Sequence, residues 1–123
     1  MLKKTAVAVV VLLWCIGFAS AEEKLGVQIY PGAKYDDAMT RSMIVSPTMS
    51  GYVYRTDDSI AKVSDFYRKQ GLVSVQVGGG SKETARFKKF DTNTDVVIKS
   101  PWKDSRTGAM MKDTLIMVLK DQN

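Results

Sequence analysis

The spacing of apolar positions predicts one amphipathic helix near the middle of the chain. Apolar residues recur at the three- and four-residue intervals that share one helix face, at Ile60, Val63, Phe66 and Tyr67. Asp57 or Asp58 can accept hydrogen bonds from the free N–H groups of the first turn, and Gly71 stands where a left-handed residue commonly ends a helix. The pattern therefore predicts a helix over residues 59–70.

Around this helix the pattern changes to that of β-strands. Segments rich in β-branched and aromatic residues, or alternating between apolar and polar residues, are 50–56, 72–77, 84–90, 96–100 and 114–120. Pro31-Gly32 predicts a turn, and a short apolar stretch over residues 42–45 ends before Pro47. Residues 115–119 are apolar on both alternating sets, which predicts a strand in the centre of the sheet, with a short helix as the alternative.

Strands that bracket one amphipathic helix indicate an α+β domain. We expect an antiparallel sheet of about four to six strands packed on one main helix, about 59–70. No repeat, low-complexity tract or linker divides residues 22–123. We therefore expect a single domain over that range.

Several of these residues also form a pattern that resembles small exported bacterial domains of uncharacterised function. Its members here are Tyr30-Pro31-Gly32-Ala33, Tyr54-Arg55-Thr56-Asp57-Asp58-Ser59, Val63 and Phe66-Tyr67. In those proteins a YPGA turn precedes a strand and a helix with the pattern T-x-D-S…V-x-x-F-Y, often followed by Gly-Trp, where this chain has Gly71-Leu72. Because these are turn and core positions, the resemblance implies a fold and no activity.

The first 21 residues form a separate unit. Lys3 and Lys4 precede an apolar run over residues 6–18, which is followed by the small residues Ala19 and Ala21. This order is typical of a cleaved secretory signal peptide, and the run is shorter than the about 20 apolar residues that span a bilayer. We expect cleavage after Ala21, export to the periplasm or beyond, and no transmembrane anchor afterwards.

Cleavage would also change the chemistry that remains. It would remove Cys15, the only cysteine, and the sequence contains no histidine. Lipidation of Cys15 is the alternative to cleavage after Ala21, and the bulky Trp14 directly before it disfavours that reaction. Residues 22–123 then lack the usual base near neutral pH and the thiol nucleophile. We expect a non-catalytic protein without a cofactor.

Carboxylates leave one catalytic alternative open. Asp36-Asp37 and Asp57-Asp58 are paired in the sequence, so a small carboxylate-dependent hydrolase is the alternative to turns and helix caps. No metal site is expected, because Asp91 to Asp95 resembles the start of a calcium loop but Val96 replaces its required glycine. Methionines that could bind Cu(I) more often fill gaps in a core; they are Met39, Met43, Met49, Met110 and Met111.

The distribution of charge predicts one candidate binding surface. Loss of Lys3 and Lys4 lowers the net charge from +5 to +3, and the remaining excess lies between Lys82 and Lys103. We expect this segment to fold as a hairpin with an anion-binding patch formed by Arg86, Lys88, Lys89 and Lys99. A solvated face, partly neutralised by nearby aspartates, is the alternative.

The expected hairpin register follows from placing its apolar residues on one face. Pairing Phe87 with Ile98 and Phe90 with Val96 requires a bulge at Lys88-Lys89, opposite Val97. Arg86 would then face Lys99 across the outer surface, a repulsion that an acidic ligand would relieve.

Together these features favour a non-catalytic exported domain with a binding or accessory role. The expected partner is a protein or an anionic polymer, with no specific nucleic acid. A polyanion-binding module acting through the basic hairpin is the first alternative, and the small hydrolase is the second.

Overall fold

The computed structural model describes residues 22–75 and 83–122. Its strands are β1 (Glu23–Lys24), β2 (Val27–Gln28), β3 (Lys34–Tyr35), β4 (Met49–Thr56), β5 (Val73–Ser74), β6 (Thr84–Lys89), β7 (Thr94–Lys99), β8 (Trp102–Lys103), β9 (Met110–Met111) and β10 (Thr114–Asp121). Its helices are α2 (Asp37–Met43) and α3 (Ile60–Lys69). The expected signal peptide lies outside the described residues.

Six of the strands form one antiparallel sheet in the order β3-β4-β10-β7-β6-β5. The short hairpins β1–β2 and β8–β9 are separate two-stranded sheets. The mixed α+β class and the antiparallel sheet are as predicted. β10 lies between β4 and β7, and residues 114–118 are buried, so the predicted central strand is confirmed.

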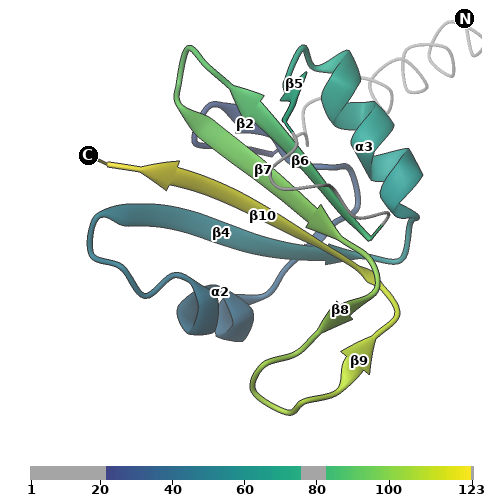
Figure 1. Ribbon diagram of the computed structural model, residues 1–123. Helices are drawn as coiled ribbons and strands as arrows, with labels where there is room; N and C mark the ends of the chain where they lie inside the picture. Colours follow the sequence, from purple (N-terminus) through teal and green to yellow (C-terminus); the bar gives the residue numbers. More distant parts are fainter. Residues whose placement is uncertain (1–21, 76–82, 123) are drawn as a thin grey trace, which may run out of the picture.

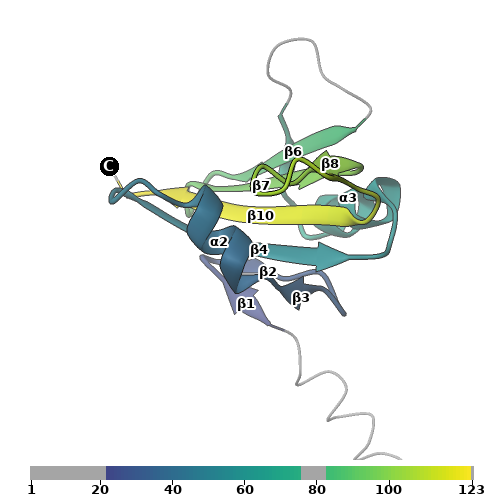
Figure 2. The ribbon, with the colours of Figure 1, turned by 90° about the horizontal axis from the view of Figure 1, so that it is seen from below.

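The two helices lie on opposite faces of the sheet (Figures 1 and 2). α3 packs against β6 and β7, and α2 packs against β4 on the face that also carries the β8–β9 hairpin. The sequence indicated only one main helix, so α2 is an addition to the expected architecture. Neither helix in the described part of the chain has the length and apolar character needed to span a bilayer.

The predicted helix is present, but its N-cap differs from the expectation. The Oγ of Ser59 accepts a hydrogen bond from the Lys62 N–H at 3.2 Å, which makes Ser59 the N-cap in place of Asp57 or Asp58. At the other end, Gly71 has a φ of +87°, the left-handed conformation predicted for it. Pro31-Gly32 also forms the expected turn, closed by a bond from the Ala33 N–H to the Tyr30 carbonyl.

α2 replaces the short apolar stretch expected near residues 42–45. Asp36 caps it by accepting a hydrogen bond from the Met39 N–H at 2.9 Å. With seven residues, the helix is too short to show several turns of apolar periodicity in the sequence. Gly51 of β4 allows its close approach, because a Cβ there would lie 2.6 Å from Cδ1 of Ile44, directly after α2.

The apolar core has two parts, one on each face of the sheet. On the α3 face it includes Val63, Tyr67, Phe87, Ile98 and Ile116. On the α2 face it comprises Met39, Val53, Val97, Trp102, Leu115 and Met117. The sheet is therefore covered on both sides, which explains why β10 is apolar in both alternating sets.

The β6–β7 hairpin has a different register from the one expected. Phe87 lies opposite Val96 and Arg86 lies opposite Val97, and the described pairing runs without a bulge. The bulge was inferred by placing Phe90 in the core, whereas Phe90 is 65% exposed and begins the turn. The predicted pair of Arg86 with Lys99 is therefore wrong.

The strand expected over residues 72–77 is described only in part. β5 covers Val73–Ser74 and pairs with β6, and Leu72 before it is buried while Val73 is exposed. Residues 76–82, which include the glycines expected to form a hairpin, lie outside the described residues.

Candidate functional site

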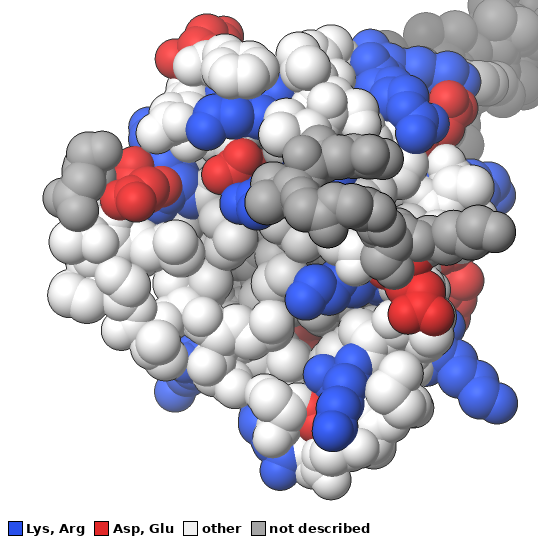
Figure 3. Space-filling view, viewed as in Figure 1, with Lys and Arg blue, Asp and Glu red and all other residues white. Residues whose placement is uncertain are grey.

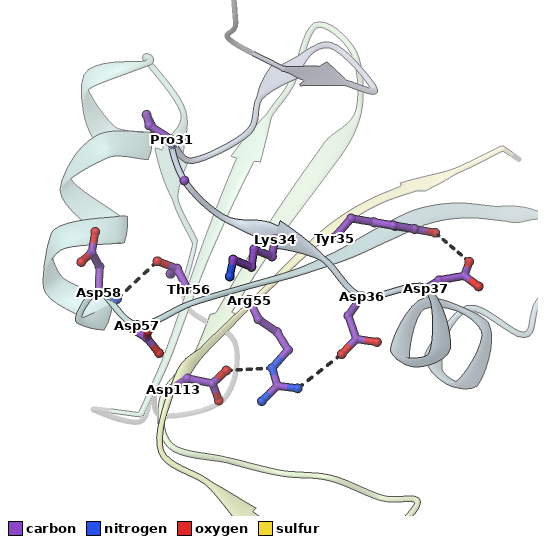
Figure 4. A pocket seen from close by; sticks show the side chains of 11 residues that line it. Pro31, Lys34, Tyr35, Asp36, Asp37, Arg55, Thr56, Asp57, Asp58 and Asp113 are labelled. Carbon is purple, nitrogen blue, oxygen red and sulfur yellow. Dashed lines mark hydrogen bonds and ion pairs between the residues drawn. The ribbon is translucent and has the colours of Figure 1, made fainter.

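A groove of about 640 Å³ opens where three segments that are distant in the sequence meet (Figure 4). These segments are the turn and strand leading into α2, the end of β4 with the loop before α3, and the loop before β10. The lining residues are Pro31, Gly32, Lys34, Tyr35, Asp36, Asp37, Arg55, Thr56, Asp57, Asp58 and Asp113. The groove is thus lined mainly by charged side chains.

Arg55 is the most constrained of these side chains. Its Nε donates to Oδ2 of Asp113 at 2.7 Å, and its Nη1 donates to Oδ2 of Asp36 at 3.4 Å. These bonds, led by the one to Asp113, raise the pKa of the Arg55 guanidinium above its ordinary value. Arg55 therefore holds the loop before β10 and the N-terminus of α2 against the end of β4.

Trp102 supports this arrangement from the β8–β9 hairpin. The Arg55 guanidinium carbon lies 5.1 Å from the centre of the Trp102 ring, within the range of a cation–π contact. The indole Nε1 donates to Oδ1 of Asp113 at 3.0 Å, so the two oxygens of this carboxylate hold two different residues. Asp113 is thereby fixed in position on the groove wall.

The other walls are also held by specific bonds. The Tyr30 hydroxyl donates to Oδ2 of Asp58, and this bond with burial raises the pKa of Tyr30 to about 12. The Thr114 hydroxyl donates to the Asp58 carbonyl at 2.6 Å, which joins β10 to the same loop. At the opposite end, Asp37 pairs with Arg41 at 3.1 Å.

Two charged side chains in the groove have no hydrogen bond or ion pair to any described residue. They are Lys34 and Asp57, both exposed and drawn without a dashed line in Figure 4. The five aspartates and two basic residues give the groove a formal charge of −3, although the whole chain carries +5. The groove therefore has the opposite sign to the protein as a whole.

The arrangement of carboxylates does not provide a metal centre. Among residues 22–75 and 83–122, no three His, Cys, Asp or Glu side chains come together in a way that could hold a metal ion. In Figure 4 Asp36 and Asp113 share Arg55, and Asp57 is drawn without a partner.

The residues of the predicted anion patch are divided between the two faces of the sheet. Arg86, Lys88 and Lys99 alternate onto the α2 face, whereas Lys89 lies on the α3 face and donates to the Gly26 carbonyl at 2.7 Å. Arg86 pairs with Asp95 at 3.7 Å. The structure thus brings three of the four together and leaves them beside an acidic neighbour.

The groove contains residues that the sequence alone did not single out for binding. The sequence pointed to Asp36-Asp37 and Asp57-Asp58 as paired carboxylates, turns or helix caps, and it predicted no binding role for Arg55 or Asp113. An arginine directly after the apolar and aromatic run Tyr52-Val53-Tyr54 was the available signal, because such a residue needs a partner when partly buried.

Comparison with protein-family models, with curated proteins and with solved structures finds no match to this chain.

Proposed function

We propose that residues 22–123 are an exported, non-catalytic binding domain whose groove takes a positively charged ligand. The observation that carries the proposal is the charge of the groove, −3 within residues 22–123 that together carry +3. A cleft lined by one sign of charge raises the local concentration of ions of the opposite sign. Export is proposed from residues 1–21 and from the resemblance to small exported bacterial domains.

The proposed ligand class follows from the contacts that the groove makes with the Arg55 guanidinium. Arg55 is held between Asp36 and Asp113, while Asp57 on the same wall has no described partner. Tyr35, which is 47% exposed, presents an aromatic ring at the rim that a cation can also contact. A lysine or arginine side chain of a polypeptide satisfies all three features, so the proposed ligand is a basic peptide segment.

Binding is better supported than hydrolysis. A carboxylate-dependent hydrolase needs two carboxyl groups that face each other across the substrate. In this groove Asp36 and Asp113 bind Arg55, Asp58 accepts from Tyr30, and Asp37 pairs with Arg41. Of the five groove aspartates, only Asp57 has no hydrogen bond or ion pair to a described residue. The groove therefore offers no second unpaired aspartate that could act together with Asp57.

Calorimetric titration with trilysine tests the proposal, with triglutamate as the matched anionic probe. The protein is expressed with its own first 21 residues. Trilysine is expected to bind. Asp57→Asn is expected to lower the affinity for trilysine about fivefold, or about 1 kcal/mol, because exposed ion pairs contribute about that much. Asp65→Asn is the control, because Asp65 is an exposed aspartate on α3 outside the groove. Absence of binding, or equal binding of triglutamate, would contradict the proposal.

A further inference from the structure

The methionines of the described chain are segregated to one face of the sheet. Six of the seven methionines lie in the described residues, and all six belong to the α2 face or to the hairpin on it: Met39, Met43, Met49, Met110, Met111 and Met117. The buried core on the α3 face contains valine, isoleucine, leucine, tyrosine and phenylalanine, and no methionine. The two faces are therefore built from different kinds of apolar side chain.

Much of this methionine-containing surface is accessible. Met43, Met111 and Leu119 are only partly buried, and Val45 and Met110 are 79% and 60% exposed. Figure 3 shows a broad uncharged surface on the side of the molecule that carries α2. We define the methionine face as the partly buried Met43, Met49, Met111 and Leu119 around the buried Met117.

The border of the methionine face is basic along β6 and β7, and Asp121, opposite Met49, is the acidic residue on the same side of β10. Arg86, Lys88 and Lys99 of β6 and β7 share the same side of the sheet as Met117, because antiparallel partners such as Met117, Val97 and Arg86 lie in one row. Asp95 is the acidic residue of these two strands on that side, so the border keeps a positive charge. In Figure 3 both basic and acidic side chains border the uncharged surface.

Methionine side chains are flexible and polarizable, and surfaces rich in them adapt to different apolar partners. An amphipathic helix binds such a surface with its apolar side, and its charged residues then meet the border of the site. Charges at a border mainly select the partner and its orientation. The basic border thus selects against basic segments and for acidic ones.

From these features we infer that the methionine face binds an acidic amphipathic polypeptide segment of a partner protein. Its apolar side would pack on the methionines, and its acidic side would meet Arg86, Lys88 and Lys99. This site is separate from the groove and prefers the opposite charge. The two proposals can therefore stand or fall independently.

The test uses two helical 16-residue peptides that share one leucine pattern, with glutamate at the polar positions of one and lysine at those of the other. Methyl NMR of the protein labelled at its methionine methyl groups reports binding directly. The glutamate peptide is expected to shift the Met43, Met49 and Met111 signals in a saturable way, and the lysine peptide to leave them in place. Equal shifts by both peptides, or none by either, would overturn the inference.

Two variants test the role of the border. Arg86→Glu/Lys99→Glu is expected to lower the affinity for the glutamate peptide at least tenfold. Lys62→Glu/Lys69→Glu, on the exposed side of α3, is expected to leave that affinity unchanged. Val45→Asp places a negative charge at a 79% exposed position beside the methionine face. This variant is also expected to lower the affinity for the glutamate peptide, by a smaller factor. Unchanged affinity in both the border variant and Val45→Asp would refute the site.

The same measurements also test two other possible ligands of the methionine face, a lipid surface and a second copy of the chain. Vesicles with anionic lipid that shift the same methyl signals, while the glutamate peptide does not, would replace the polypeptide with a lipid surface. Concentration-dependent shifts of these signals without any peptide would assign the face to a second copy of the chain. Either result overturns the inference as stated.

Discussion

The Tyr30 hydroxyl donates a hydrogen bond to Oδ2 of Asp58, a residue 28 positions further along the chain. This bond ties the turn at Pro31-Gly32 to the loop that leads into α3, and both segments line the groove. Asp58 looked like a helix cap in the sequence, but its carboxylate has this tertiary role and the cap is Ser59. Asp58 therefore joins two segments that line the groove, and Ser59 caps α3.

The Tyr30–Asp58 bond predicts a loss of stability in strong alkali. The folded protein raises the pKa of Tyr30 from 10.0 to about 12, so it holds the phenol proton more tightly than the unfolded chain does. The stabilisation is fully present below pH 10.0 and is lost as pH rises through about 12. Urea melts of wild type and Tyr30→Phe should give a difference in unfolding free energy that is constant from pH 8 to about 10 and then decreases. A difference that stays constant up to pH 12 would contradict the assignment.

Ser59→Ala should destabilise the protein by about 1 kcal/mol, because it removes the acceptor for the Lys62 N–H at the start of α3. Ser105→Ala, at an exposed position in the β8–β9 loop, is the matched control and should be close to neutral. Urea denaturation of both variants measures the effect. If the two melted alike, the capping role of Ser59 would be rejected.

Val63→Asp should unfold the domain. Val63 is fully buried on the inner face of α3, and an unpaired carboxylate there costs several kcal/mol. Ala61→Asp makes the same change at an exposed position of the same helix and should keep the fold. Circular dichroism of the two variants distinguishes them. A folded Val63→Asp protein would mean that α3 presents another face to the sheet.

The protein recovered from the exported fraction should begin at Glu22, because Ala19 and Ala21 occupy the small-residue positions that signal peptidase requires. Intact-mass measurement gives the start directly. A Cys15 that carries lipid, or a chain still beginning at Met1, would disprove cleavage after Ala21.

The parts of the fold that the sequence predicted are those with a local signal. α3 repeats its apolar spacing over three turns, and β10 is apolar throughout, so periodicity was sufficient for both. α2 has only seven residues, and its docking depends on Gly51, which belongs to β4 and not to the helix pattern itself. The hairpin register failed because Phe90 was assumed to be buried, and exposure is decided by what else covers the sheet.

The groove could not be predicted for a related reason. It exists only where the turn before β3, the loop before α3 and the loop before β10 meet, and no sequence spacing reports such a meeting. Asp113 appears in the sequence as an ordinary loop residue, yet it contacts both Arg55 and Trp102. The basic patch was visible in the sequence as a charge excess, but only the register shows that Lys89 faces the other side.

The position of β10 has a consequence for how the chain is made. β10 joins β4 to β7, yet it follows every other strand in order of synthesis. Until residues 114–121 have left the ribosome, the pair β3–β4 and the group β5–β6–β7 share no common neighbour, and the sheet stays in two halves. The growing polypeptide therefore remains open until almost all of the described sequence has been translated. A chain whose sheet is completed late can still pass through a translocation channel in an extended form. The export expected from residues 1–21 would require such a passage.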